Sequence, residues 1–303
     1  MKFSIVTPVF NGEKFLEDSI KSVLSQKGDF EIEYIIIDGK SADNTLEIIK
    51  KYDNLIKTDQ FPIKCLGIKL KWISEKDKGM YDAVNKGFMM ATGDIYAYIN
   101  SDDFYLPDAF NIISKTFVIF PNIRWLKGIT NFLDQKTKEI TLGACLIYNR
   151  GWITMGIYGR NAYFIHQDSV FWKSDLWNEL GPINSTLKYA GDYDLWIKFS
   201  KSEPLWSLNK SVSCFRKREG QLSADMSEYR QEQQQISQEK GFLNFKIKIF
   251  FWLKQKFIYK IFDDFFIILY KFLFADRNKE YININNSGEL VIKQSKTYKI
   301  DEK

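Results

Sequence analysis

Histidine and cysteine are scarce in this chain of 303 residues. It has one histidine, His166, and three widely spaced cysteines, Cys65, Cys145 and Cys214. A single histidine excludes any site that needs two, and the cysteine spacing excludes a Cys-x-x-Cys zinc site. Three unclustered cysteines also exclude a disulfide framework and are typical of a reducing compartment.

Long apolar runs are absent as well. No stretch approaches the roughly 18 uninterrupted apolar residues that a membrane-spanning helix needs. Pro8 and the pair Asn11-Gly12 interrupt the first apolar run too early for a secretory signal. We therefore expect a protein that starts in the cytoplasm and does not cross a bilayer by a helix.

Charge is balanced outside one segment. The net charge is +5, and residues 240–275 contain seven lysines and two aspartates, so the rest of the chain is neutral. A neutral remainder argues against nucleic acid as a partner. The contents of 45% hydrophobic and 27% charged residues are those of an ordinary folded protein, with room for one large domain or two small ones.

The first hundred residues alternate between short apolar runs and helical patterns. We predict strands at residues 3–7, 34–38, 68–74 and 95–99, with helices at 13–26, from 45, and at 80–91. This alternation predicts an α/β fold with a doubly wound, mostly parallel sheet. After residue 103 we predict helices at 108–120, 192–201 and 228–240, shorter strands near 124–132 and 167–172, and a hairpin at 281–294.

Polar residues mark the ends of three predicted strands, at residues 7–11, at Asp38-Gly39 and at 100–103. In open α/β sheets, ligands bind outside the carboxyl ends of the strands. Neighbouring carboxylates such as Asp102 and Asp103 suit a hard divalent cation that also takes the phosphates of a substrate. A diphosphate bridged by such a cation is a good leaving group. The alternative is that both aspartates serve only a turn or a helix cap.

Five segments together resemble the family 2 glycosyltransferases, which are inverting enzymes with a GT-A fold. These are TPVFN (7–11), IIIDGKSADNT (35–45), DKGMYDAVNKG (77–87), ATGDI (91–95) and NSDD (100–103). HQDSVF (166–171) and GDYDLW (191–196) are similar to segments of bacterial capsule, exopolysaccharide and O-antigen members. The resemblance covers residues 2–240.

The resemblance implies roles for the strand-end residues. Asp103 is the implied ligand of Mn²⁺ or Mg²⁺, in a motif of the DxD type, and Asp102 is implied to lie near the ribose or the diphosphate. Other residues that it implies in substrate binding are Thr7, Pro8, Asn11 and Asp38 near the nucleoside, and Asp77, Gly79, Asp82 and Lys86 along the donor. Many relatives have a second acid where this chain has Gly39. Asp82 and Lys86 also form an i,i+4 pair that needs no function.

The resemblance also implies a general base. Inverting transfer needs a carboxylate that accepts the proton of the acceptor hydroxyl. Relatives carry a Glu-Asp pair where this chain has Gly191-Asp192, so Asp192 is the implied base and Asp194 the lesser candidate. The alternative for Asp192 is that it only caps a helix.

Two further segments are implied to contact the substrates. His166 and Gln167 are implied on the acceptor side or at the diphosphate; the alternative for His166 is an ordinary packed histidine. RKREGQLS (216–223) resembles a mobile loop that closes over the diphosphate, with Arg218 as the implied contact. A solvated basic face is the alternative for this loop.

Residues 241–275 are predicted to form an amphipathic helix with an aromatic face and a lysine-rich face. Such a helix fits an anionic membrane surface. The alternatives are that the aromatic face packs on the protein itself or forms a homodimer. We thus divide the chain into a nucleotide-sugar-binding half at 1–105, an acceptor-side half at 106–240, the helix at 241–275 and a polar tail at 276–303.

The sequence therefore predicts a metal-dependent glycosyltransferase on the inner face of the cell membrane. Its donor would be a nucleotide-diphosphate sugar with UDP, GDP or dTDP, and its acceptor a glycan or a lipid-linked molecule of bacterial surface polysaccharide synthesis. A sugar nucleotidyltransferase is one alternative, but PVFNGEK is not its glycine-rich loop. A non-catalytic, membrane-associated nucleotide-sugar-binding protein is another, but it has no need of NSDD and DKGMYDAVNKG together.

Overall fold

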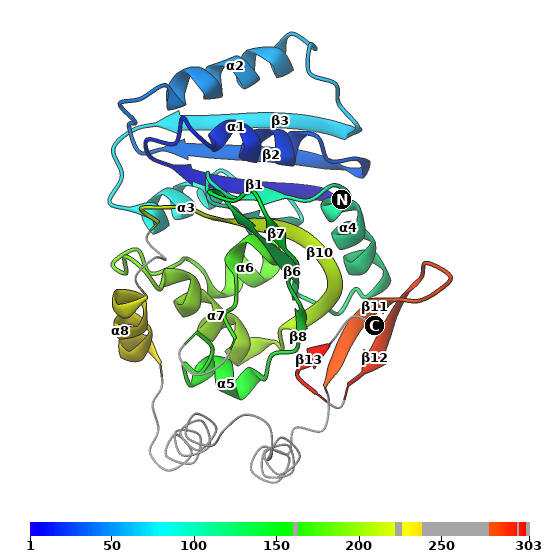
Figure 1. The fold of residues 1–303 in the computed structure, drawn as a ribbon. Helices are drawn as coiled ribbons and strands as arrows, with labels where there is room; N and C mark the ends of the chain where they lie inside the picture. The colour runs from blue at the N-terminus through cyan, green and yellow to red at the C-terminus, as the bar shows by residue number, and fades with distance from the viewer. Residues whose placement is uncertain (160–162, 222–225, 238–278, 296, 301–303) are drawn as a thin grey trace.

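A computed structural model describes residues 1–159, 163–221, 226–237, 279–295 and 297–300 (Figure 1). The helix that we predict at residues 241–275 lies outside these described residues. Among the helices that are described, none has the length and apolar character that crossing a membrane requires.

One large mixed sheet runs through the molecule. Its main path has the order β12-β11-β10-β6-β9-β4-β1-β2-β3, with β5 and β7 attached beside it. The strands of this sheet are β1 (Lys2–Val9), β2 (Gly28–Asp38), β3 (Cys65–Ser74), β4 (Ile95–Tyr98), β5 (Phe104–Tyr105), β6 (Trp125–Asp134), β7 (Ile140–Thr141), β9 (Val170–Lys173), β10 (Trp206–Lys217), β11 (Glu280–Ile284) and β12 (Leu290–Gln294). The short strands β8 (Cys145–Leu146) and β13 (Lys299–Ile300) form a second, two-stranded sheet.

The strands that begin the chain pair in parallel, as the alternating pattern predicts. β4, β1, β2 and β3 are mutually parallel, and β6 is parallel to β10. Between these two groups lies β9, which is antiparallel to both of its neighbours, β4 and β6. The doubly wound, mostly parallel sheet is confirmed.

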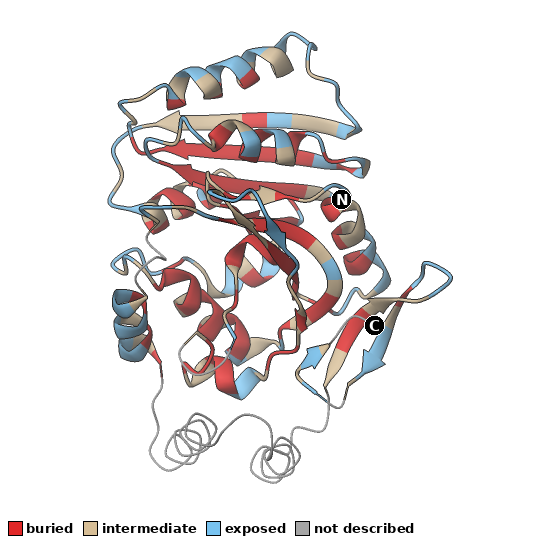
Figure 2. Cartoon of the chain, in the orientation of Figure 1, coloured by how far each residue is buried: buried red, intermediate tan, exposed pale blue. Residues whose placement is uncertain are grey.

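Helices cover both faces of the sheet (Figure 1). The helices are α1 (Leu16–Leu24), α2 (Thr45–Lys57), α3 (Met80–Met89), α4 (Ala109–Ile119), α5 (Arg150–Thr154), α6 (Ser174–Leu180), α7 (Gly191–Ser202) and α8 (Ser227–Ile236), with a 3₁₀ turn η1 (Gln167–Ser169). Side chains of α1, α2 and α4 share one core cluster with Phe3 and Ile5 of β1, whereas α3 and α5 to α8 share another with Val6. Successive side chains of β1 thus enter opposite cores, and Figure 2 shows the central strands as buried.

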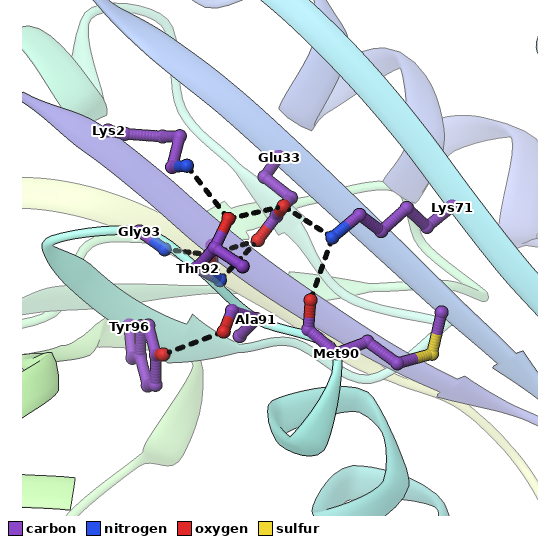
Figure 3. Close-up of polar contacts among 9 residues, drawn as sticks. Lys2, Glu33, Lys71, Met90, Ala91, Thr92, Gly93 and Tyr96 are labelled. Atoms are coloured by element: carbon purple, nitrogen blue, oxygen red, sulfur yellow. Dashed lines mark hydrogen bonds and ion pairs between the residues drawn. The ribbon is translucent and has the colours of Figure 1, made fainter. Parts of the chain in front are cut away.

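A buried carboxylate joins the amino ends of the central strands (Figure 3). Glu33 of β2 accepts hydrogen bonds from Ser4 Oγ at 2.6 Å and Thr92 N at 2.7 Å, and forms an ion pair with Lys71 Nζ at 2.6 Å. A Cβ at Gly93 would lie 2.7 Å from the carbonyl oxygen of Lys2, so only glycine fits there. The ATGDI segment therefore holds the sheet together at the edge opposite the carboxyl ends of β1 and β4.

The strand β10 is absent from the sequence prediction, and its register explains why. Its pairing with β6 shifts between Ser207 and Ser211 and again between Ser211 and Ser213. These irregularities break the alternation of inward and outward side chains that marks a strand in a sequence. β10 also includes Arg216 and Lys217, so the first two residues of the predicted loop at 216–223 belong to a strand.

The predicted hairpin is confirmed. β11 and β12 pair in an antiparallel register from Glu280–Gln294 to Ile284–Leu290, and Ile282 is fully buried. β11 also pairs with β10 through Leu208 and Ile282, so the hairpin extends the large sheet.

Candidate active site

A cavity of about 420 Å³ opens at the carboxyl ends of β1 and β4. It collects residues from loops that are far apart in the sequence, as expected at this edge of an open α/β sheet. Seven of the predicted site residues line it: Pro8, Asp77, Gly79, Asp102, Gln167, Asp192 and Arg218. Residues that line it without having been predicted include Phe10, Tyr81, Tyr98, Lys188, Tyr189 and Tyr229.

Asp192 is the buried acid of this cavity. It is the second residue of α7 and 6% exposed, and its Oδ1 accepts a hydrogen bond from its neighbour Tyr193 N at 2.7 Å. The hydroxyls of Tyr81 and Tyr229 lie 3.3 and 3.4 Å from the same oxygen. Burial raises the pKa of Asp192 to about 7, because these hydrogen bonds only partly replace water around the charge. The N-cap position belongs to Ala190, so Asp192 is not the N-cap residue, although it accepts a hydrogen bond from a backbone N–H of the first turn of α7.

Asp194, the lesser candidate, is engaged elsewhere. Its Oδ2 forms an i,i+4 ion pair with Lys198 Nζ at 2.7 Å along α7. It is absent from the residues that line the cavity. This geometry gives Asp194 a helix-stabilising role.

The two aspartates after β4 point to different places. Asp102 lines the cavity, and its Oδ2 accepts a 2.7 Å hydrogen bond from Arg218 Nε. Asp103 is 1% exposed; its Oδ1 accepts from Arg216 N at 2.9 Å, whereas its Oδ2 has no hydrogen-bond partner among the described residues. Burial, with the nearby charges of Asp102 and Asp168, raises the pKa of Asp103 well above its ordinary range.

Arg216 fastens this strand end to the rest of the fold. Its guanidinium donates to the carbonyl oxygen of Asp102, to Gln135 Oε1 and to Asp18 Oδ2, each at 2.8 Å. The side chain is 5% exposed and lies over the ring of Phe15 at 4.8 Å. Arg216 is therefore a buried clamp between β10, α1 and the turn after β4, whereas Arg218 is the arginine that reaches the cavity.

The predicted nucleoside contacts near β1 and β2 are mostly engaged within the protein. Asp38 is fully buried and accepts hydrogen bonds from Ser41 N at 3.2 Å and Ser74 Oγ at 2.6 Å. Asn11 Oδ1 accepts from Ala42 N at 2.9 Å, and Thr7 Oγ1 accepts from Tyr34 OH at 3.0 Å. None of Thr7, Asn11 and Asp38 is among the residues that line the cavity; Pro8 and the exposed ring of Phe10 are.

Asp77 takes up the space beside Gly39. A Cβ built on Gly39 would lie 2.7 Å from Asp77 Oδ2, so a second acid at that position would collide with this carboxylate. Asp77 Oδ1 accepts from Gly79 N at 2.9 Å, and Gly79 begins α3 with a φ of 126°, which glycine adopts without strain. Asp77 therefore occupies the space into which a side chain at position 39 would extend.

Asp82 and Lys86 form an ion pair outside the cavity. Their charged atoms lie 3.4 Å apart, and Lys86 Nζ is also 2.8 Å from Glu75 Oε1. Neither residue is among those that line the cavity. They stabilise the first turns of α3 and the segment before it.

His166 faces a second, adjoining cavity of about 900 Å³. Its ring packs against those of Phe132, Phe164 and Phe215, with centroids 5.1, 5.0 and 5.6 Å away. Burial, with the charges of Lys127 and Lys217, lowers the pKa of His166 to about 3, so the ring is neutral at physiological pH. Gln167 lines both cavities and is 7% exposed.

The residues at this strand end fit a divalent cation. Mg²⁺ and Mn²⁺ take carboxylate oxygens and keep positions for substrate phosphates. Asp103 Oδ2 is a buried oxygen without a hydrogen-bond partner among the described residues, and Asp102 presents a carboxylate to the cavity beside it. The described part of the chain has no group of three or more histidine, cysteine, aspartate or glutamate side chains, so protein ligands alone would not complete a coordination shell.

Comparisons with known proteins agree on one family. Residues 4–117 match the sequence model of Glycosyl transferase family 2. An uncharacterized glycosyltransferase of Rickettsia typhi is 26% identical over 211 residues, which cover 65% of this chain and 58% of that protein. The chain thus spans less than two thirds of the length of this relative.

Solved structures share the fold. The structure of residues 1–349 of Staphylococcus aureus TarS with UDP-GlcNAc gives a TM-score of 0.54 at 19% identity, covering 74% of this chain and 61% of that one. A mannosyltransferase from Pyrobaculum calidifontis with GDP-Man and Mn²⁺ gives a TM-score of 0.52 at 15% identity, covering 73% of this chain and 59% of that one. These likenesses confirm the predicted fold class of GT-A type.

Proposed function

We propose that this chain, whose residues 4–117 match the model of Glycosyl transferase family 2, transfers a sugar from a nucleotide-diphosphate sugar to an acceptor hydroxyl with inversion. The observation that carries the proposal is Asp192, a buried carboxylate with a pKa of about 7 in the wall of the same cavity as Asp102. A general base works best when its pKa lies near the working pH.

In this mechanism Asp192 removes the proton of the acceptor hydroxyl as the oxygen attacks the anomeric carbon. Oδ1 is held by Tyr193 N, with the hydroxyls of Tyr81 and Tyr229 nearby. Oδ2 accepts no hydrogen bond from the described residues, so we assign the proton to this atom. Burial and the charge of Asp192 raise the pKa of Tyr81 and Tyr229 well above the ordinary value, so both phenols stay protonated.

We propose that the donor binds along the part of the cavity formed by the carboxyl end of β1 and the start of α3. Pro8, Asp77 and Gly79 would contact the nucleoside, because they lie at the end nearest to β1 and α3. Arg218 would bind the diphosphate, releasing Asp102. Thr7, Asn11 and Asp38 would act by holding the loops beneath the nucleoside in shape, and Asp82 and Lys86 by stabilising the start of α3.

A divalent cation, Mn²⁺ or Mg²⁺, would be held by Asp103, with Asp102 beside it; because Asp103 is buried and does not line the cavity, cation binding would require the turn after β4 to move. When bound, it would neutralise negative charge on the leaving diphosphate. The mannosyltransferase with GDP-Man and Mn²⁺ supports a cation in this fold. Because Asp102 Oδ2 contacts Arg218 at 2.7 Å, cation binding would have to move this side chain.

We further propose that the acceptor is a glycan or a lipid-linked molecule of bacterial surface polysaccharide synthesis. The enzyme would work in the cytoplasm at the inner face of the membrane, with residues 241–275 bound to anionic lipid. The lysines and aromatic residues of that segment support this location.

A panel of nucleotide sugars tests the proposed reaction. Purified protein is mixed with UDP-, GDP- and dTDP-sugars, and nucleotide release is followed with Mn²⁺, with Mg²⁺ and with excess chelator. We expect release with one nucleotide class, lost in chelator and in Asp103→Ala. If nucleotide release in excess chelator equals that with metal, the proposed metal dependence is wrong. If no donor binds and none releases its nucleotide, the proposed transferase function is wrong.

A further inference from the structure

We propose that the cavity of about 900 Å³ beside the candidate active site binds an acceptor glycan that carries negative charge, as phosphodiester or carboxylate groups. This inference rests on the proposed transferase function and specifies the chemical class of its acceptor. The two cavities share wall residues, among them Gln167, Phe215 and Arg218. A chain lying in the second cavity therefore adjoins the cavity that contains Asp192.

Four cationic side chains line this second cavity in addition to Arg218. Lys14 precedes α1, Lys136 lies in the turn after β6, Lys217 ends β10, and Arg230 lies on α8; all four line the cavity. In the part of the chain that the structure describes, none of them forms an ion pair. Positive charges that line a concave surface raise the local concentration of anions.

The acidic residues of the wall offset only part of this charge. Asp134 and Glu219 are the two acids that line the cavity. Asp134 Oδ1 accepts hydrogen bonds from Lys136 N at 2.8 Å and Thr137 N at 3.0 Å, so this carboxylate organises the turn that carries Lys136. These hydrogen bonds lower the pKa of Asp134, which also lies close enough to Lys136 and Lys217 for their charges to lower it further. With Arg218 already paired to Asp102, four cations face two acids, and the surplus is positive.

The floor of the cavity is aromatic. Phe132, Phe164 and Phe215 surround the neutral ring of His166, and Lys217 Nζ lies 4.8 Å from the centre of the Phe132 ring. Aromatic rings provide flat apolar area on which the C–H face of a sugar packs. A floor for sugar rings beside a cationic rim matches a charged saccharide better than it matches a free inorganic anion.

Gln167 provides an independent sign of a ligand. Its side chain is 7% exposed, and its Nε2 has no hydrogen-bond partner among the described residues. Buried amide groups in native proteins are nearly always satisfied. Because Gln167 Nε2 is itself buried, it would donate to an oxygen of a ligand after a change of side-chain rotamer. Gln167 lines both cavities and is thus placed where the acceptor chain would pass from one to the other.

Direct binding measurements test the proposal. The full chain is titrated with three oligomers of similar length: oligogalacturonate, which carries carboxylates, a glycerol-phosphate oligomer, and neutral maltohexaose. The double variant Lys136→Gln/Lys217→Gln is compared with Lys64→Gln/Lys115→Gln, which removes the same charge from exposed positions outside both cavities. UDP and GDP are titrated in parallel.

We expect one of the anionic oligomers to bind, with an affinity that falls as salt is added. The double variant should bind it about 3- to 30-fold more weakly, as two partly exposed charge contacts provide, and the control should bind like the native chain. The oligomer that binds more tightly identifies the anion. Affinity for the nucleotide should stay within about twofold in both variants, because these lysines are outside the donor cavity.

Several results would overturn the proposal. Maltohexaose could bind as tightly as the anionic oligomers, or both double variants could lose the same affinity. A parallel loss of nucleotide affinity would instead assign the lysines to the donor, and loss of binding to vesicles of anionic phospholipid in the same variant would assign them to a membrane. Nucleotide release separates this proposal from the proposed function. If an anionic oligomer binds but no donor releases its nucleotide, the glycan-binding site stands and the transferase function is wrong.

Discussion

At the scale of single residues, Asp192 is the proposed base, and its burial is expected to lower the stability of the fold. Burial raises its pKa from 3.8 to about 7, so the folded protein favours the protonated form over a wide pH range. A base with this pKa is ionised in a useful fraction of molecules at neutral pH and still holds a proton well. Both consequences can be measured with one substitution, Asp192→Asn.

The first consequence concerns the rate. Asparagine keeps the shape of the side chain and its acceptor oxygen but cannot take up a proton, so acceptor-dependent transfer by Asp192→Asn should fall by about two to four orders of magnitude. In the native enzyme, kcat/KM should rise with pH through about 7, because only the ionised carboxylate acts as a base. Steady-state turnover between pH 5 and 9 measures both effects.

The matched control is Asp194→Asn on the same helix. Asp194 is paired with Lys198, so this change should lower the rate by much less and leave its pH profile intact. A near-native rate in Asp192→Asn, or a larger loss in Asp194→Asn, would move the base to another residue. If Asp192→Asn lost donor affinity together with the rate, Asp192 would bind and not catalyse.

The second consequence concerns the free energy of unfolding. A carboxyl group with a raised pKa lowers stability as pH rises from 3.8, its unfolded value, to about 7, and the loss is complete above 7. Asp192→Asn should therefore be more stable than the native chain by about 1–3 kcal/mol at pH 8 and equally stable below pH 4. Urea unfolding at the two pH values measures this difference. A gain that is the same at both would show that ionisation is not its cause.

Some site residues could be predicted from the sequence, and the reason is topological. Parallel strands bring their carboxyl ends to one edge, so residues that follow β1 and β4, such as Pro8 and Asp102, meet there. Which of Asp102 and Asp103 faces the cavity could not be predicted, because the turn after Tyr98 has no periodicity. Tyr229 was also missed, since no spacing links α8 to the strand ends.

At the scale of elements, the contacts of Glu33 join neighbouring strands of the large sheet. The Glu33 carboxylate joins β2 to β1, to β3 and to the turn before β4 through Ser4, Lys71 and Thr92 (Figure 3). Although burial raises its pKa, the hydrogen bonds from Lys71, Ser4 and Thr92 together lower the pKa to about 2. The contacts therefore require an ionised carboxylate.

We expect Glu33→Gln to lower the free energy of unfolding by about 2–4 kcal/mol at pH 7, because the half-buried Lys71 loses its counter-charge. A carboxylate with a lowered pKa stabilises the fold above 4.5, and this contribution is lost as pH falls from 4.5 towards 2. The gap between native and variant chains should thus narrow over that range in urea unfolding. Glu47→Gln, which breaks an exposed helix pair with Lys50, is the control and should cost less than about 1 kcal/mol.

The predictable elements are those whose side chains follow one period. β1, β2 and α1 to α3 carry uninterrupted apolar patterns because both faces of the inner strands are buried. β10 was missed since its bulges at Ser211 shift the period within the strand. The β11–β12 hairpin could be predicted from Asn286-Ser287-Gly288, where Gly288 has a φ of 82°.

At the scale of the whole molecule, the hairpin changes how the segment at 241–275 must be tested. β11 pairs with β10, and Tyr281, Ile282 and Leu290 are buried, so the hairpin belongs to the large sheet (Figure 1). Deleting every residue after Lys240 would remove these strands together with the lysine-rich segment. Loss of membrane binding in such a truncated chain could then come from unfolding alone.

Charge reversal within the segment avoids this problem. Lys256→Glu/Lys260→Glu removes two of the six lysines at 241–275 and leaves β11 and β12 in place. Each basic residue near an anionic surface contributes about 1 kcal/mol, so reversing two should weaken binding to phosphatidylserine vesicles by at least about 30-fold. Nucleotide release from the donor should be unchanged, because the donor cavity has no residue from this segment among its described walls.

Lys64→Glu/Lys115→Glu, which reverses two exposed lysines elsewhere, should bind vesicles almost like the native chain, because a reversal outside the segment leaves its attraction to anionic lipid intact. Co-sedimentation with anionic and with neutral vesicles measures the effect. Equal sedimentation of both double variants, or equal binding to neutral vesicles, would mean that the segment does not hold the enzyme on anionic membranes.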